Sequence, residues 1–191
     1  MKTKLNIRTL VLFVFMLLII GLRVVAPLSS DFMLIASFSG VGAVALFGGF
    51  YLKNRLTSFL LPITVLFLSD LGLILTMGKD YGFYEGWYYT YLAFVLMIAV
   101  GRFFFNKVNV KNILTASFVA VFIHWIVSDF GVWLGSTFYP QTLSGFWACL
   151  VMAIPFELKF LAATLTYVAI MYGVFETLKA KYPSLNLTVN S

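Results

Sequence analysis

The chain has 191 residues, of which 62% are hydrophobic and 10% are charged, and its mean hydropathy is +0.99. This composition excludes a water-soluble globular domain. The formal net charge of +6 therefore indicates membrane topology and not nucleic-acid binding. The single cysteine, Cys149, excludes an intramolecular disulfide and a multi-cysteine metal site, and we expect it to be a small packing residue.

Six apolar segments bounded by charged or turn-forming residues follow one another along the chain. They cover residues 9–26, 33–52, 56–77, 87–105, 112–134 and 156–178. Each has at least 18 residues, enough to cross a hydrocarbon core of roughly 30 Å as a helix. We therefore predict an all-α integral membrane protein, with one domain of six transmembrane helices over residues 1–181 and a short cytoplasmic tail over residues 182–191.

Basic residues gather at every second junction between these segments. Ten of the 13 basic residues lie on one predicted side: Lys2, Lys4, Arg8, Lys53, Arg55, Arg102, Lys107, Lys111, Lys179 and Lys181. The positive-inside rule then places both termini in the cytoplasm of a bacterium, with the protein in its inner membrane. We expect the first segment to be kept and not cleaved as a signal peptide, because Arg23 and Pro27 stand where a cleavage site needs small neutral residues.

The stretch over residues 142–155 is apolar but too short to cross a membrane. Because proline cannot continue a helix without a kink, Pro155 predicts a short outer half-helix or interfacial segment before the last span. Tyr139 and Trp147 fit the membrane interface, where amphipathic aromatic side chains settle. Aromatic residues between Tyr81 and Tyr91 form a second cluster, interpreted as an interface belt, with stacking walls for a flat ligand as the alternative.

Five ionisable residues fall within the outer halves of the predicted spans. They are Arg23, Asp70, Asp129, Glu157 and Lys159. Charges in a bilayer core are costly, and such residues normally face a bundle interior or water and often mark a site. Two interpretations stay open: a polar ligand cavity, or an internal clamp in which Arg23 pairs with Asp70 or Asp129 while Lys159 extends to the headgroups.

The fifth predicted span carries a stripe of residues spaced four apart. Trp125, Asp129 and Trp133 share one face of the helix, so an indole N–H is expected to satisfy the carboxylate. His124 lies about 140° around the helix from Asp129, so the two do not form a dyad. We expect His124 to bond Ser128 or a neighbouring helix as a structural residue, with contact to a ligand as the second interpretation.

The second predicted span is rich in small residues: Ala36, Ser37, Ser39, Gly40, Gly42, Ala43, Ala45, Gly48 and Gly49. Small residues let helix backbones approach closely, which predicts packing inside the bundle. A docking face for a partner helix is the alternative.

Catalytic and cofactor motifs are missing from the sequence. It has no Gly-x-Ser-x-Gly, His-Glu-x-x-His, Cys-x-x-Cys or phosphate-binding glycine-rich loop, and one histidine cannot supply the usual multi-histidine metal site. We therefore predict a protein that is not an enzyme and that has no cofactor or metal. An intramembrane enzyme using Asp70 and Asp129 as a carboxylate pair is the minority alternative.

Four sequence patterns carry a resemblance to a known family. They are Gly-Ala-Val-Ala-Leu-Phe-Gly-Gly-Phe-Tyr over residues 42–51, Leu-Pro at 61–62 with Leu-Ser-Asp-Leu at 68–71, Asp-Phe-Gly-Val-Trp-Leu at 129–134 with Tyr-Pro-x-Thr at 139–142, and Ala-Ile-Pro-Phe at 153–156. The chain resembles a DUF6580-like family of uncharacterised small bacterial membrane proteins. That family in turn resembles the substrate-binding S components of energy-coupling-factor vitamin transporters.

This resemblance implies a six-helix bundle that captures a vitamin or metal in an outward pocket and docks on a coupling subunit served by two ATPases. S components dock through small residues on the first helix, whereas here the small residues lie in the second span. We therefore expect a small-molecule (vitamin-like) binding or uptake protein, with the lipid bilayer and these transport subunits as partners. The alternative is a membrane assembly or interaction protein without a ligand. The expected ligand-binding residues are Arg23, Asp70, His124, Trp125, Asp129, Trp133, Tyr139 and Glu157, with Trp87 as a further pocket wall.

Overall fold

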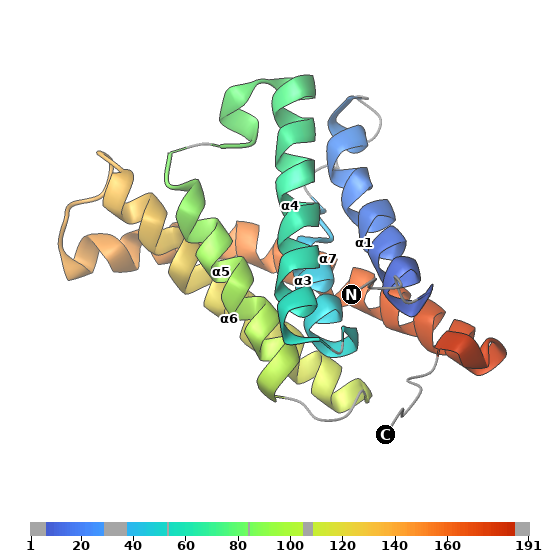
Figure 1. The fold of residues 1–191 in the computed structure, drawn as a ribbon. Coiled ribbons are helices and arrows are strands. Elements are labelled where there is room, and N and C mark those ends of the chain that lie inside the picture. Colours follow the sequence, from blue (N-terminus) through green and yellow to red (C-terminus); the bar gives the residue numbers. More distant parts are fainter. Residues whose placement is uncertain (1–6, 29–37, 53, 84, 105–108, 186–191) are drawn as a thin grey trace.

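The computed structural model describes residues 7–28, 38–52, 54–83, 85–104 and 109–185. Within these ranges every regular element is helical. The helices are α1 (Ile7–Val25), α3 (Val41–Tyr51), α4 (Arg55–Met77), α5 (Trp87–Ala99), α6 (Val110–Gly135) and α7 (Leu143–Lys181). A π-helical segment (Val100–Phe104) extends α5, and 3-10 turns cover Ala26–Leu28, Lys79–Tyr81 and Pro183–Leu185. Figure 1 shows the arrangement of these elements.

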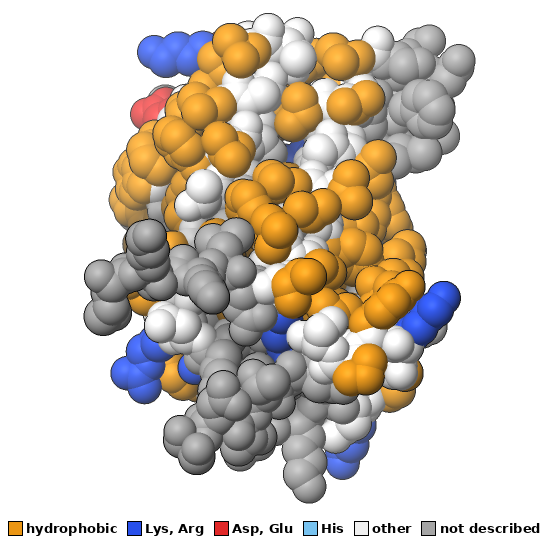
Figure 2. All heavy atoms as spheres, turned by 45° about the vertical axis from the view of Figure 1, so that its right-hand side comes forward, with side chains coloured by type: hydrophobic (Ala, Val, Ile, Leu, Met, Phe, Trp, Pro, Cys, Tyr) orange, Lys and Arg blue, Asp and Glu red, His pale blue; other side chains and the backbone are white. Residues whose placement is uncertain are grey.

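Four of the helices, α1, α4, α6 and α7, are long and apolar enough to cross a membrane, while α3 and α5 are shorter apolar helices. Many large apolar side chains on the long helices are exposed, as expected for a surface that meets lipid and not water. On the face shown in Figure 2, hydrophobic side chains cover the middle, and most of the visible Lys and Arg side chains lie in the upper and lower parts.

Polar residues fix where three helices begin. The Asn54 side chain accepts a hydrogen bond from the Leu56 N–H at 2.8 Å and begins α4. Asn109 and Thr142 cap α6 and α7 in the same way, each accepting from a backbone N–H three residues later. Such caps satisfy donors that the first helical turn leaves free, so these starts are encoded locally in the sequence.

The short helix α3 forms the centre of the bundle. It packs against α1, α4, α5, α6 and α7, and nine of its 11 residues are buried. The small residues predicted to pack inside the bundle do so, because Gly42, Ala43, Ala45, Gly48 and Gly49 are all buried. The alternative of a partner-docking face on this helix is therefore wrong for the described residues.

The predicted second span over residues 33–52 is wrong in its first part. The described residues 38–40 are not helical, and α3 begins only at Val41; residues 33–37 lie outside the described part. The Ser39 hydroxyl oxygen accepts the Val41 N–H at 3.4 Å, and serine and glycine favour such non-helical helix starts. At 1.5 Å per residue, α3 is about 16 Å long, roughly half of a hydrocarbon core.

The segment 142–155 is not a separate half-helix, which corrects the prediction made from Pro155. Helix α7 runs without a break from Leu143 to Lys181, with Pro155 inside it. Proline removes one backbone hydrogen bond, but Cys149 and Leu150 before it and Ala163 after it are all buried, and the helix packs on α6. This packing on both sides of Pro155 keeps one helix, which passes behind α4 in Figure 1.

The carboxyl end of α3 is held by arginines from two other elements. Arg8 on α1 donates from Nη2 to the Tyr51 carbonyl oxygen at 3.0 Å, and Arg102 in the π-helical segment donates to the Leu52 carbonyl oxygen at 2.8 Å. Cationic donors suit the negative end of a helix dipole. These two bonds satisfy carbonyl groups that α3 itself leaves without a partner.

The chain beyond α7 is folded at least as far as Leu185, within the segment predicted as a short tail. Pro183–Leu185 forms a 3-10 turn in which Leu185 is buried. Its carbonyl oxygen accepts a hydrogen bond from Arg8 Nη1 at 3.0 Å. Residues 186–191 lie outside the described part. The turn thus joins the same arginine that caps α3.

The contact between α3 and the π-helical segment is made by backbone against backbone. A Cβ atom added to Gly49 would meet the Ile98 carbonyl oxygen, and one added to Gly101 would lie 2.7 Å from the Leu46 carbonyl oxygen. Real Cβ atoms do not approach backbone oxygen so closely, so both positions need glycine.

We expect Gly49→Ala to destabilise the protein by about 1–3 kcal/mol, because the added methyl group forces α3 away from the π-helical segment. Gly21→Ala and Gly173→Ala are matched controls, since a Cβ at either helical position meets nothing within 4 Å. Cys149 is the single cysteine and is buried, so its reaction with a thiol dye during heating in detergent reports the unfolding temperature. Equal unfolding temperatures for Gly49→Ala and the two controls would contradict the close approach.

Candidate functional site

Arg23 and Asp70 form an ion pair that joins α1 to α4. Arg23 Nη1 lies 2.5 Å from Asp70 Oδ1 and donates to Ser69 Oγ at 2.6 Å. The second carboxylate oxygen, Oδ2, accepts from the Tyr91 hydroxyl of α5 at 2.7 Å. The Asp70 side chain is 4% exposed and that of Arg23 is 21% exposed. Both carboxylate oxygens are thus satisfied, and the geometry is that of an internal clamp between three helices.

Aromatic side chains cover this clamp. Trp87 packs edge-on against Tyr91 and Phe83, with ring centroids 5.1 Å apart in each case. Trp87 therefore belongs to the packing beside Asp70, on α5.

His124 and Glu157 form a second polar pair, between α6 and α7. His124 Nδ1 lies 3.0 Å from Glu157 Oε1 and 3.3 Å from Oε2. The imidazole ring also packs on Phe160, with ring centroids 4.4 Å apart. His124 thus bonds a neighbouring helix, as expected, whereas Ser128 lies 3.4 Å from Thr90 on α5. The side chains of His124 and Glu157 are both largely buried.

Asp129 is the exceptional carboxylate of the structure. The residue is 9% exposed, and its Oδ2 atom is buried without a hydrogen-bond partner among the described residues. It interacts electrostatically with Glu157 and His124. Buried polar atoms in folded proteins almost always have a partner, so an exception needs an explanation. The described residues contain no cluster of histidine, cysteine and carboxylate side chains that could hold a metal ion.

The predicted indole bond to Asp129 is wrong. Trp125 Nε1 donates to the Leu150 carbonyl oxygen of α7 at 3.1 Å, and Trp133 Nε1 donates to the Pro140 carbonyl oxygen at 2.9 Å. The shared stripe along α6 does place these residues on one side of the helix, but the indoles reach across to main-chain acceptors outside α6. Asp129 therefore receives nothing from its own stripe.

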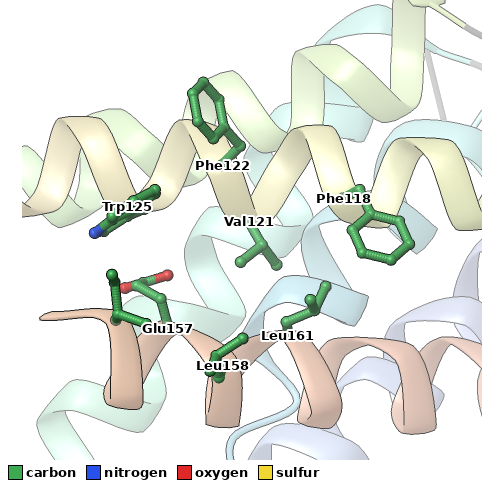
Figure 3. A pocket seen from close by; sticks show the side chains of 8 residues that line it. Phe118, Val121, Phe122, Trp125, Glu157, Leu158 and Leu161 are labelled. Carbon is green, nitrogen blue, oxygen red and sulfur yellow. The ribbon is translucent and has the colours of Figure 1, made fainter. Parts of the chain in front are cut away.

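A cavity of about 290 Å³ lies between α6 and α7, beside the His124–Glu157 pair. Figure 3 shows side chains from the two helices facing each other across it. Its lining residues are Phe118, Val121, Phe122 and Trp125 from α6 and Ile154, Glu157, Leu158 and Leu161 from α7. Glu157 is the one charged residue among these eight. The cavity can therefore receive an apolar molecule with one polar group, because ligand pockets are mostly apolar with few polar contacts.

The structure divides the predicted site residues into separate groups. Trp125 and Glu157 line the cavity, and His124 and Asp129 are their polar neighbours. Arg23 and Asp70 pair with each other in the clamp between α1 and α4 and do not line the cavity. Of the two interpretations of the five outer charges, the contacts show the clamp for Arg23 and Asp70, and they place Glu157 in a separate pair with His124.

The remaining predicted residues lie elsewhere. Trp133 bonds the connection between α6 and α7, and Tyr139 lies half-buried in that connection without lining the cavity. Val121, Leu158 and Leu161, which line the cavity, were missed by sequence reasoning. They carry no sequence signal, because apolar residues that face a cavity and apolar residues that face lipid look alike in a transmembrane helix.

We expect Asp70→Asn to lower stability by up to about 3–5 kcal/mol, because it leaves the Arg23 charge largely buried without its counter-ion. Arg23→Met in the same chain should recover much of this loss, since removing both charges avoids the desolvation cost. Thermal unfolding of the two single variants and the double variant measures the coupling. Strictly additive effects would show that the two side chains do not stabilise each other.

Comparisons with known proteins give a family but no characterised relative. No curated protein and no solved structure matches the chain. A family model described as a family of unknown function, DUF6580, matches residues 3–185. Because this match covers nearly the whole sequence, the chain belongs to the DUF6580 family.

Proposed function

We propose that the protein is a membrane-embedded binding protein that takes up a small molecule, in the manner of the S components it resembles. The observation that carries this proposal is the cavity between α6 and α7, whose apolar walls meet the carboxylate of Glu157. Its volume of about 290 Å³ is at the lower end of the range of ligand pockets, which suits a molecule of vitamin size or smaller. Phe118, Phe122 and Leu158 in its lining are exposed, so the cavity opens at the protein surface, where a ligand can enter it.

The proposed topology has six crossings with both termini in the cytoplasm of a bacterial inner membrane. The four long helices can each cross on their own. The shorter helix α3 does not need the same length, because neighbouring helices cover it, and non-helical backbone such as residues 38–40 is tolerated at membrane depth where protein surrounds it. The charge pattern supplies the orientation.

Energy for uptake would come from the coupling subunit and ATPases that the resemblance implies. The small residues of α3 are buried, so a coupling subunit cannot dock on them. The outward face of α1 instead presents large apolar side chains, with Leu18 64% and Leu22 46% exposed. A coupling subunit would therefore meet bulky side chains on α1, in contrast to the small-residue face of S components.

A membrane assembly or interaction protein remains the second candidate. The clamp favours it, because Arg23 and Asp70 satisfy each other together with Ser69 and Tyr91 and need no ligand. This explanation does not extend to the cavity that Glu157 lines, or to the Asp129 oxygen that has no hydrogen-bond partner among the residues that the structure describes.

Native mass spectrometry of the protein purified in mild detergent tests the binding function. We expect a discrete small molecule to remain bound to the wild type and to be lost from Leu161→Trp, because the larger indole fills the cavity that Leu161 lines. Leu75→Trp is the matched control, since Leu75 is 86% exposed on α4 and away from the cavity. A wild-type protein that carries no ligand, or a ligand retained equally by both variants, would reject this cavity as the binding site.

Cysteine labelling in intact cells tests the proposed topology. In a Cys149→Ser background, a membrane-impermeant maleimide should label Lys79→Cys and Phe138→Cys, whereas Tyr182→Cys should react only after the cells are permeabilised. All three positions are exposed, so a lack of labelling reports the side of the membrane and not burial. Labelling of Tyr182→Cys in intact cells would refute the cytoplasmic carboxyl terminus.

A further inference from the structure

The polar groups beside the cavity are an unbalanced set of acceptors. Glu157 lines the cavity directly. Asp129 interacts electrostatically with Glu157, and its Oδ2 atom is buried without a hydrogen-bond partner among the described residues. An ionised carboxylate accepts through two oxygens and about four lone-pair positions. In the described part of the chain, His124 is the one side chain that bonds Glu157, so acceptor capacity remains at both carboxyl groups.

The described protein supplies too little positive charge to this region. Among the described residues His124 is the one candidate cation beside these two carboxyl groups. Arg23 is bound to Asp70 between α1 and α4. Lys159 is exposed and lies about 200° around α7 from Glu157, on roughly the opposite side of the helix. No lysine or arginine is among the cavity's lining residues.

The apolar walls of the cavity strengthen the electrostatic effect of these excess carboxyl groups. Charge–charge interactions strengthen as the surroundings become less polar, so a negative cluster beside an apolar cavity attracts a cation strongly and repels an anion. Trp125, Phe122 and Phe118 also line the cavity. These side chains suit an apolar body, and Trp125, which lies beside Glu157 in Figure 3, adds an attraction for an ammonium group there.

From this cavity, its charged lining and the unpartnered Asp129, we propose that the ligand is a cation: a small apolar molecule bearing an amine. Its ammonium group pairs with Glu157, and the same positive charge compensates Asp129. This inference rests on the proposed binding function. It narrows the class of ligand to amines and excludes carboxylates.

Three probes with one carbon skeleton and different charge test the proposal: phenylbutylamine, phenylbutanol and phenylbutyrate. Isothermal titration calorimetry on the purified protein in detergent should show binding of the amine, binding of the alcohol that is weaker by about tenfold or more, and no detectable binding of the acid. Leu161→Trp measures partition into the micelle, because its cavity is filled.

Neutralising the carboxylates should remove the preference for the cation. We expect Glu157→Gln and Asp129→Asn each to weaken amine binding by about tenfold while leaving the alcohol nearly unchanged. Both substitutions preserve side-chain shape, so either variant serves if the other fails to fold. Glu85→Gln and Asp80→Asn are matched controls, because they remove the same charges at exposed positions and should not change binding.

Three results would overturn the inference: equal affinity for the alcohol or the acid, no binding of the amine, or a cation preference that survives both neutralising variants. These results leave the binding function itself to be judged by the co-purified ligand and its loss from Leu161→Trp. A bound ligand that proves to be an anion or a neutral molecule would retain the binding function and reject the amine. The experiments can therefore reject the amine ligand without rejecting the binding function.

Discussion

The bundle depends on the burial of α3, a helix too short to cross a membrane and surrounded on all sides by protein. Its carboxyl end leaves carbonyl groups that water cannot reach easily, and Arg8 and Arg102 supply the missing donors. These bonds tie α1 and the π-helical segment to the same helix end. Since the other helices all pack on α3, the position of this end also sets how α6 and α7 lie around it.

Around α3, the charged side chains between the helices fall into two groups that differ in their bonding partners. The Asp70 carboxylate receives Arg23 and Tyr91 and so joins three helices at little net cost. On the other side, Glu157 bonds His124 and lines a cavity, and Asp129 interacts electrostatically with both of these residues. The first arrangement is complete within the chain, whereas the second has capacity for a further group. Under the proposed function, the clamp of α1, α4 and α5 would serve stability, and the pair of α6 and α7 would serve binding.

The sequence predicted what depends on local pattern. The apolar runs gave α1, α4 and α6 to within a few residues, and small residues correctly indicated the close packing of α3. It failed where long-range contacts decide the outcome. Pro155 predicted a break, but packing of α7 on α6 on both sides of the proline maintains one helix. The choice of Asp70 over Asp129 as the partner of Arg23 depends on which helices are neighbours, and one sequence does not contain that information.

Asp70 and Asp129 also differ in what each carboxylate contributes to the stability of the fold. A carboxylate that stabilises a membrane bundle needs a counter-ion or donors, and Asp70 has both. One oxygen of Asp129 is buried and has no hydrogen-bond partner in the described part of the chain, so folding bears a desolvation cost there without a bond in return. An apolar residue at this position would serve packing better. The cost of Asp129 is understandable if its carboxyl group acts on a molecule outside the chain, and the cavity lined by Glu157, with which Asp129 interacts, is where the proposed cation would lie.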